Sequence, residues 1–379
     1  MNQVIQPVPP LDLTRQYATI ERDVSAAVMQ VLASGQYING PVVESFSEQF
    51  GQYVGSKECI VCNSGTDALY LALRALNIGL GDQVITSPFT FIATAEAISA
   101  VGATPVFIDI ELETFNFDPS KIAAAITPQT KAIMPVHIFG QPVDMDAVMA
   151  VAQQHHLPVI EDCAQATGAR WQDQKVGSIG RIGCFSFFPT KNLGGCGDGG
   201  ALTTDDPEIA ATARLLRDHG SKVRYQHEAI GINSRLDAVQ AAILQIKLQY
   251  LEQWNAQRQA VADRYQQLLS PITGVRPPVA TVGGHSVWNQ YSILIEGVTA
   301  EQRDRLRTQM QAQGISTMVY YPVPLHRQPV YEDLGYQPGS LPNTEQAAEQ
   351  VLALPMFPEL TDEQQNRVVY ALKDALTAL

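Results

Sequence analysis

The sequence predicts an α/β protein with a mixed, mostly parallel sheet flanked by helices, plus a smaller C-terminal α/β domain. Between about residues 56 and 204, short apolar runs alternate with helical patterns, which is typical of a parallel sheet. A long amphipathic pattern then begins near Ser234 and ends before the proline-rich stretch 270–278. Further strand and helix patterns follow it. We therefore expect a large domain over residues 1–250 and a small domain over residues 251–379.

The elements of the large domain can be assigned in order from the periodicity of their apolar residues. In the first expected helix, Leu69, Ala72, Leu73 and Leu76 fall at i, i+3, i+4 and i+7. The expected strands are 58–63, 83–86, 104–110, 131–136, 157–162, 183–188 and 200–204, and the expected helices are 66–82, 90–102, 119–126 and 144–155. The small domain should contain strands at 287–296 and 315–321, a helix at 300–314 and a last helix.

The charge and composition exclude several classes of function. The chain of 379 residues has a formal net charge of −13, and an acidic chain lacks the clustered cations that nucleic acid requires. Its first residues show no basic region followed by an apolar core, and no apolar run is long enough to cross a bilayer. The charged fraction of 17% is low, which predicts a large core or an oligomer interface. We expect neither nucleic acid nor membrane as a partner.

The cysteines predict a reducing compartment and no metal site. Five cysteines are spread along the chain, so a disulfide framework is not expected and a cytoplasmic location is. Cys59 and Cys62 form a C-x-x-C within an expected strand. They could be half of a zinc site or a redox pair, but no second pair of ligands accompanies them. Two small apolar residues of a strand explain them better.

A glycine-rich stretch at residues 194–200 contains the pattern G-x-G-x-x-G. A dinucleotide fingerprint requires a helix after these glycines, whereas the residues that follow predict a strand. A phosphate loop requires its lysine after the glycines, whereas Lys191 precedes them. What remains is a lysine beside a loop poor in side chains, where a ligand could approach the backbone closely. An exposed loop lysine is the alternative interpretation.

Two other turns carry polar residues at positions suited to ligands. Asn63, Ser64, Gly65 and Thr66 lie between a strand and a helix, where free N–H groups and hydroxyls can hold a phosphate or simply cap the helix. Asp162 ends an apolar strand, where open α/β sheets place ligand-binding residues. Its carboxylate could pair with a cation or only begin the next turn.

Arg235 follows the residues that we expect to cap the long helix, Asn233 or Ser234. A cation in the first turn of a helix is mildly unfavourable, which suggests an anionic partner, although a solvated surface arginine is the simpler alternative. Together, a phosphate seat, a carboxylate at a strand end and a loop lysine are what pyridoxal 5′-phosphate requires: an anchor for its phosphate, a partner for its pyridine nitrogen and an amine for a Schiff base.

The sequence also resembles a known family, the fold-type-I, pyridoxal-phosphate-dependent nucleotide-sugar aminotransferases of the DegT type. The resemblance covers nearly the whole chain and rests on seven motifs in order. They include NSGTDALYLALRAL at 63–76, PVIEDCAQATGA at 158–169, SFFPTKNLGGCGDGGA at 186–201, GINSRLDAVQAAIL at 231–244 and YYPVPLHRQP at 320–329. The resemblance implies a transaminase that works as a homodimer with shared active sites.

The resemblance also implies roles for residues around the cofactor. Lys191 is the Schiff-base lysine and proton shuttle, Asp162 pairs with the pyridine nitrogen, and Gln165 bonds the phenolic oxygen of the ring. The phosphate is held by Gly65, Thr66 and Ser186, Phe91 stacks on the ring, and Asn233 reaches the phosphate of the neighbouring subunit. Dehydratase relatives replace the lysine with histidine, so Lys191 favours transamination. Regulatory relatives carry a DNA-binding extension, which this acidic chain has no spare basic domain to form.

The substrates follow from the same resemblance. Glutamate is the expected amino donor and leaves as 2-oxoglutarate, while a nucleotide-diphosphate-linked keto-sugar accepts the amino group. The family contacts the sugar at the positions of Tyr37, Arg235, Tyr320, Tyr321 and His326. The chain most resembles the branch that aminates C3, in particular of UDP-2-acetamido-2-deoxy-3-oxo-glucuronate, whose carboxylate Arg235 could pair with. However, His326 also suits enzymes of dTDP-linked 3-keto-6-deoxy sugars, and amination at C4 is a further alternative.

Overall fold

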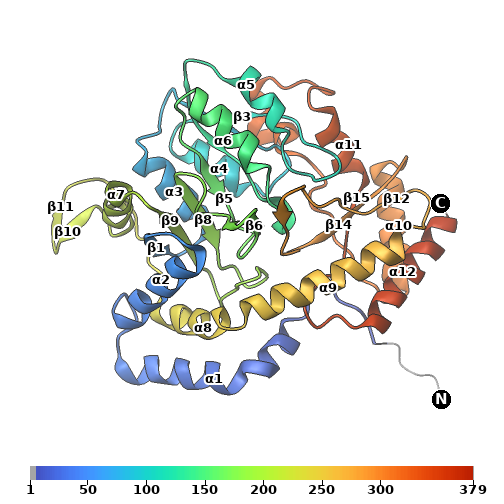
Figure 1. The fold of residues 1–379 in the computed structure, drawn as a ribbon, viewed down its shortest axis with the longest axis horizontal. Helices are drawn as coiled ribbons and strands as arrows, with labels where there is room; N and C mark the ends of the chain where they lie inside the picture. Colours follow the sequence, from blue (N-terminus) through green and yellow to red (C-terminus); the bar gives the residue numbers. More distant parts are fainter. Residues whose placement is uncertain (1–5, 379) are drawn as a thin grey trace.

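The computed structural model describes residues 6–378, and a seven-strand layer lies at its centre (Figure 1). One part has the order β1 (Glu58–Cys62), β9 (Gly200–Thr204), β8 (Ile182–Ser186), β5 (Ile160–Asp162); the other has β3 (Thr104–Phe107), β2 (Gln83–Thr86), β4 (Thr130–Met134). Parallel bridges from Ile133 to Val159 and from Val136 to Asp162 join β4 to β5. Only β9 runs antiparallel to its neighbours in this layer. The predicted mixed, mostly parallel sheet is confirmed.

Helices cover both faces of this layer because adjacent residues of a strand point in opposite directions. In β1, Ile60 and Cys62 pack in a cluster with α3 (Gly65–Ala75) and α7 (Pro207–Arg217), whereas Cys59 and Val61 pack in a cluster with α2 (Pro41–Val54) and α8 (Ala238–Leu248). The helices after the strands are α3 (Gly65–Ala75), α4 (Ala93–Ala100), α5 (Ile122–Ala125), α6 (Met145–Gln154) and α7 (Pro207–Arg217), with the 3-10 turns η1 (Pro119–Lys121) and η2 (Ile138–Gly140).

The predicted long helix is in fact two helices, and it begins later than expected. The chain forms α8 (Ala238–Leu248) and α9 (Leu251–Leu269), which are separated where Gln249 and Tyr250 donate tighter i→i−3 hydrogen bonds. The N-cap is Asp237, so neither Asn233 nor Ser234 caps the helix and Arg235 is not in its first turn. The N-terminal helices α1 (Leu13–Ser34) and α2 (Pro41–Val54) lie beside α8 (Figure 1).

The C-terminal part has its own antiparallel sheet, β12 (Val275–Arg276), β14 (Tyr291–Ile295) and β15 (Val351–Leu354). The expectation of a strand at 315–321 is wrong. Ile315 and Met318 form isolated bridges, and β15 is the strand that pairs with β14. The helices are α10 (Ala300–Ala312), α11 (Pro342–Gln350) and α12 (Asp362–Thr377), with η3 (Leu325–Arg327) and η4 (Pro329–Leu334). Val8 joins their core. The division at residue 250 stays a prediction.

Two small antiparallel sheets complete the fold. The hairpin of β10 (Ser221–Val223) and β11 (Gln226–His227) projects from one end of the molecule (Figure 1). The strands β13 (Gly284–His285), β6 (Arg170–Trp171) and β7 (Gln174–Lys175) pair beside the segment that leads into β14. Within residues 6–378, every helix is too short or too polar to cross a membrane.

Candidate active site

Asp162 lies at the carboxyl end of β5 and is 4% exposed. The hydroxyl of Thr94 donates to its Oδ2 at 2.8 Å, and the N–H of Ala164 donates to its Oδ1 at 3.1 Å. Burial raises the pKa of this carboxyl group above its usual range, although both hydrogen bonds and the charge of Lys191 oppose the shift. A buried carboxylate with a raised pKa lacks a compensating charge, so this position favours the binding of a protonated nitrogen.

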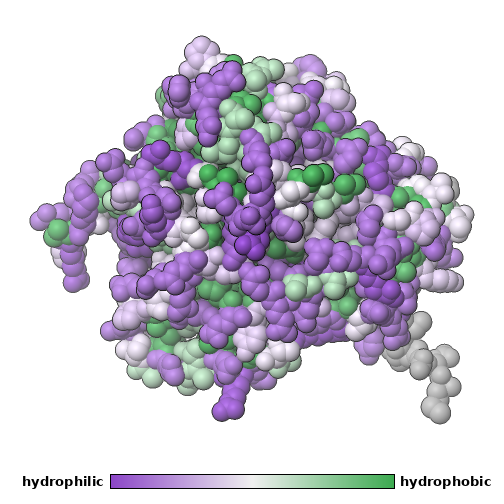
Figure 2. All heavy atoms as spheres, viewed as in Figure 1, coloured by the Kyte–Doolittle hydropathy of each residue, from purple (hydrophilic) through white to green (hydrophobic). Residues whose placement is uncertain are grey.

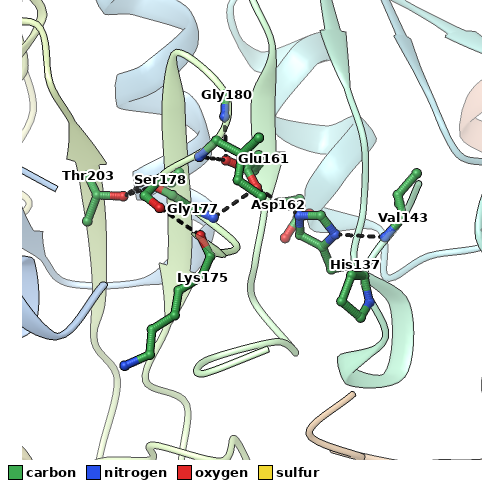
Figure 3. Close-up of polar contacts among 12 residues, drawn as sticks. His137, Val143, Glu161, Asp162, Lys175, Gly177, Ser178, Gly180 and Thr203 are labelled. Atoms are coloured by element: carbon green, nitrogen blue, oxygen red, sulfur yellow. Dashed lines mark hydrogen bonds and ion pairs between the residues drawn. The ribbon is translucent and has the colours of Figure 1, made fainter. Parts of the chain in front are cut away.

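The neighbouring Glu161 points away from Asp162 and is fully bonded within the protein (Figure 3). Its Oε1 accepts from the N–H groups of Ile179 and Gly180 at 2.9 and 2.7 Å, and its Oε2 accepts from Gly177 at 2.8 Å. The same Oε2 accepts from Nε2 of His137 at 3.1 Å, because the N–H of Val143 donates to Nδ1. This carboxylate therefore holds the 177–180 turn and has a structural role.

The group of His137, Glu161 and Cys163 has the composition of a metal site. Their potential ligand atoms lie within 4.8 Å of one another in the described part of the chain. However, Glu161 accepts four hydrogen bonds and both ring nitrogens of His137 are bonded. Burial also raises the pKa of the Cys163 thiol well above its usual range, which keeps it protonated. The ligand atoms are thus already used, and we interpret the group as a buried polar network.

Lys191 lies in the loop between β8 and β9, and its N–H donates to the carbonyl of Phe188 at 2.9 Å. The side chain is half-buried. Burial lowers the pKa of its amine to about 8, against the opposing charge of Asp162. A lysine with this pKa is partly neutral at physiological pH and can act as a nucleophile or a base. The charges of Lys191 and Asp162 affect one another's pKa, which joins the two residues that the sequence predicts as catalytic.

The glycines after Lys191 allow the loop to pack closely against the rest of the protein. A Cβ at Gly194 would lie 2.3 Å from the carbonyl oxygen of Pro189, and one at Gly195 or Gly197 would lie 2.8 Å from the amide of Gln240 on α8. These clashes show that the loop is pressed onto its own turn and onto a helix. The exposed Cys196 leaves the far side of this loop open, so the approach of a ligand to its backbone stays a prediction.

The predicted phosphate seat is formed where α3 begins beside the end of β8. A Cβ at Gly65 would lie 2.7 Å from Cβ of Ser186, so a glycine is required for these two segments to meet. Ser64 caps the helix by accepting from the N–H of Asp67 at 3.1 Å. The N–H groups of Gly65 and Thr66 precede the first intrahelical bond, so they are available to an anion at the positive end of the helix. The structure thus brings Gly65, Thr66 and Ser186 together.

Gln165 connects Asp162's end of the sheet to the 320–328 loop. Its Oε1 accepts from the N–H of Phe139 at 2.7 Å, and its Nε2 donates to the hydroxyl of Tyr321 at 3.1 Å. The N–H of Leu325 donates to the carbonyl of Pro88, which places this loop beside the one that carries Phe91. The ring of Phe91 is 57% exposed and thus open to a stacking partner. Burial raises the pKa of the Tyr321 hydroxyl.

A second group of predicted residues surrounds the segment 233–237. The hydroxyl of Ser234 donates to Oδ1 of Asn63 at 3.1 Å, so the segment lies against the phosphate turn of the same chain. Asn233 itself is exposed, and its contact with a neighbouring subunit stays a prediction. The N–H of Ala238 donates to the carbonyl of Tyr37, whose side chain is 48% exposed.

Arg235 forms a long ion pair with Asp218, a carboxylate that is bonded more closely to Arg217. Its Nη1 lies 4.0 Å from Oδ1 of Asp218, while the other oxygen of Asp218 accepts from Nε and Nη2 of Arg217 at 3.0 and 2.7 Å. Nε of Arg235 is buried and has no hydrogen-bond partner among the described residues. The guanidinium is thus only weakly paired, and its side chain is 27% exposed.

His326 differs from the other predicted sugar contacts because its ring is buried. It is 2% exposed, and its Nε2 lies 3.2 Å from Oε1 of Glu345, which also accepts from the N–H of Gly339. Tyr320 is half-buried and Tyr321 is bonded to Gln165. A direct role for His326 at the sugar stays a prediction, and its burial beside Glu345 indicates a part in holding the loop.

Sequence reasoning missed the residues that act from behind the site. Thr94 bonds the carboxylate of Asp162, and Asn192, Asn255 and Asn289 form a buried chain of amides next to Lys191. Thr94 lies 68 residues from Asp162 in the sequence, so no local pattern connects them. For Asn192, the sequence offered one signal of a role at the site, which is its position directly after Lys191.

The comparison with protein families shows to which family the chain belongs. The model of the "DegT/DnrJ/EryC1/StrS aminotransferase family" matches residues 18–373. The chain belongs to this family. Three similar proteins cover nearly the same length. A "Pleiotropic regulatory protein" of Geobacillus stearothermophilus is 47% identical over 96% of both chains. The "dTDP-3-amino-3,4,6-trideoxy-alpha-D-glucose transaminase" of Streptomyces venezuelae is 44% identical over 97% of this chain and 96% of its own.

The third relative acts on a different sugar. It is the "UDP-2-acetamido-2-deoxy-3-oxo-D-glucuronate aminotransferase" of Pseudomonas aeruginosa, 43% identical over 92% of this chain and 95% of its own. Solved structures agree with the family. DesV of S. venezuelae in complex with a ketimine intermediate has a TM-score of 0.94 at 44% identity, covering 98% of this chain and 99% of its own. The structure of ntda from Bacillus subtilis with bound cofactor PMP has a TM-score of 0.91 at 35% identity, covering 99% and 86%. The predicted fold-type-I aminotransferase is confirmed.

Proposed function

We propose that this chain is a pyridoxal-phosphate-dependent aminotransferase that moves an amino group from glutamate to C3 of a nucleotide-diphosphate-linked keto-hexose. The observation that carries the proposal is the pair of Lys191 and Asp162. A lysine whose pKa is lowered to about 8 and a buried carboxyl group with a raised pKa occur beside a helix N-terminus with free N–H groups. Membership of an aminotransferase family gives this arrangement its chemistry.

The residues present fit the cofactor. Asp162 is a buried carboxyl group that lacks a full countercharge, as the partner of a pyridine nitrogen must be. Gly65, Thr66 and Ser186 would hold the phosphate, Gln165 would bond the phenolic oxygen, and Phe91 would cover the ring face. When bound, the cofactor supplies an electron sink for the carbon that carries the migrating amino group.

The protein's own part is to bind, orient and move protons. Lys191 would bind the cofactor covalently and, once released, carry a proton between the substrate carbon and the cofactor. Its pKa of about 8 suits this task, because a shuttle works best when its pKa is near the working pH. Asp162 would keep the pyridine nitrogen protonated, and Thr94 holds its carboxylate in place with a 2.8 Å hydrogen bond.

For the sugar we propose UDP-2-acetamido-2-deoxy-3-oxo-glucuronate, with Tyr37, Tyr320, Tyr321, Arg235 and the His326 loop around it. The partly exposed guanidinium of Arg235, whose ion pair with Asp218 is long at 4.0 Å, supports a substrate with a carboxylate, which a guanidinium can bind at two points. A dTDP-linked 3-keto-6-deoxyhexose is the second candidate, because a relative that forms a dTDP-linked amino sugar is as similar as the relative named for the uronate. A 4-keto sugar is the third.

We also propose a homodimer with shared active sites. Helix α1 exposes Leu13, Tyr17, Met29 and Leu32, and small hydrophobic groups lie along this lower edge of the molecule in Figure 2. Asn233 is exposed and would reach the phosphate of the partner. Light scattering of the purified protein should show twice the mass of one chain. All five cysteines are free, which agrees with a cytoplasmic setting.

A panel of UDP-, dTDP- and GDP-linked keto-sugars with glutamate as donor tests the proposal, with mass detection of the product. We expect amination of the UDP-linked 3-keto uronate. Arg235→Gln should lower kcat/KM for that substrate by about 10- to 150-fold, since a lost charge-assisted pair costs about 1.5–3 kcal/mol. It should leave a dTDP-linked 3-keto-6-deoxyhexose almost unaffected. Amination of the deoxy sugar alone would refute the uronate assignment, and no amination of any sugar would refute the function.

A further inference from the structure

Asn192 follows Lys191 directly and is buried in a chain of amide hydrogen bonds. It is 4% exposed. Its Nδ2 donates to Oδ1 of Asn255 at 2.7 Å and to the carbonyl of Val287 at 2.8 Å, and its Oδ1 accepts from Nδ2 of Asn289 at 2.9 Å. Three of the four bonds that an amide side chain can make are thus formed. Asn192 is held between α9 and the segment that leads into β14.

Asn289 extends the same chain to the other side of Lys191. Its Nδ2 also donates to the carbonyl of Thr190 at 3.2 Å, and its backbone N–H donates to the carbonyl of Phe139 at 2.9 Å. Phe139 in turn donates to Gln165 at 2.7 Å. A continuous series of hydrogen bonds therefore runs from the residue before Lys191 to the amide predicted to face the cofactor.

We propose that Asn192 and Asn289 are positioning residues that fix the backbone on both sides of Lys191 and set the direction of its side chain. The inference rests on the proposed covalent role of Lys191. Neither asparagine needs to touch the cofactor or the substrate, and both act through residues 190–192.

The packing of the loop explains why such a clamp is needed. Leu193 anchors the loop in the core after the lysine, but Phe188 and Thr190 before it are exposed, so burial does not hold the chain on that side. The rest of the loop is attached further along, where Nζ of Lys247 donates to the carbonyl of Gly194 at 2.7 Å. The two asparagines therefore supply side-chain anchors on either side of the lysine. A displacement of about 1 Å at a reacting group can cost about 100-fold in rate.

The test compares Asn192→Ala and Asn289→Ala with the wild type and with Gln365→Ala. Gln365 is 1% exposed and donates to the carbonyl of Val261 in the C-terminal core, so its loss destabilises the protein without reaching Lys191. Two quantities are measured on the cofactor-free protein. One is the rate constant for Schiff-base formation after pyridoxal phosphate is added, followed by visible absorbance. The other is the pH dependence of acetylation of Lys191, followed by mass spectrometry.

We expect both asparagine variants to form the Schiff base about tenfold more slowly or worse, with noncovalent cofactor affinity changed less than about threefold. Acetylation of Lys191 should show a pKa shifted upward from that of the wild type, because a loosened loop admits water. Gln365→Ala should match the wild type in both measurements. Wild-type behaviour of the asparagine variants, or equal slowing in Gln365→Ala, would overturn the inference. If Lys191 of the wild type is acetylated but forms no Schiff base, the result contradicts the proposed function. The comparison of the acetylation profiles then still decides whether the asparagines position Lys191.

Discussion

Replacement of Lys191 by methionine should abolish activity and yet stabilise the cofactor-free protein at neutral pH. The reason is that the folded protein disfavours the charged amine. Burial lowers its pKa from 10.5 to about 8. The unfolded chain therefore holds more protons than the folded one between these two pH values, so stability rises with pH across this window. Below about pH 8 the full cost of burying the charge is present, and methionine removes it.

The magnitude follows from the size of the shift. A lowering from 10.5 to about 8 corresponds to about 3 kcal/mol, at about 1.4 kcal/mol per pH unit. The side chain is only half-buried, so solvent screening reduces this value. We expect Lys191→Met to raise the free energy of unfolding by about 1–3 kcal/mol at pH 7, and the gain should shrink as the pH approaches 10.

Urea unfolding of the cofactor-free protein at pH 7 and pH 10 measures this difference. The exposed Lys131, at the start of β4, offers a matched control, and Lys131→Met should change stability little at either pH. If Lys191→Met is no more stable than the wild type at pH 7, or if its gain does not depend on pH, the account of a buried, partly neutral lysine is wrong.

Three other substitutions test separate parts of the site. Asp162→Asn should lower kcat by about 100-fold or more. It should also move the pKa of Lys191 below 8, because the charge of the Asp162 carboxylate raises that pKa in the wild type. A pH titration of Lys191 labelling that gives the wild-type pKa would contradict this. Gly65→Ala should weaken cofactor binding by about tenfold in calorimetry, since its Cβ would lie 2.7 Å from Cβ of Ser186, and unchanged affinity would rule out the proposed phosphate seat. Glu161→Gln should cost about 2–4 kcal/mol in urea unfolding, because it puts an amide donor among four donors; wild-type stability would show that the network is not needed.

The strands and short helices of the sheet were predictable because each has its own apolar pattern. Asp162 was identified from its place at a strand end, and the turn around Gly65 from its place between a strand and a helix. The parts that failed depend on contacts between distant segments. Ser234 resembles a helix cap, but its hydroxyl bonds Asn63, 171 residues away, and the helix begins only after Asp237.

The glycines after Lys191 show the same limit. Their number suggested a place where a ligand could approach, but it gave no sign that the loop packs closely against Pro189 and Gln240. Likewise, the amide chain from Asn192 joins residues 63 and 97 positions apart, and no periodicity or spacing encodes such contacts. Local patterns thus supplied the candidates for the chemistry, but the residues that hold these candidates in place required the three-dimensional structure.

Transfer of labelled nitrogen from glutamate to a nucleotide-linked 3-keto sugar tests the central claim most directly. The purified protein is incubated with pyridoxal phosphate, nitrogen-labelled glutamate and the keto-sugar, and the sugar product is analysed by mass spectrometry. Borohydride treatment of a parallel sample then locates the cofactor on the chain. We predict labelled amino sugar with the wild type, none with Lys191→Met, and a reduced cofactor adduct on Lys191. Labelled product from Lys191→Met, or an adduct on another lysine, would contradict the account.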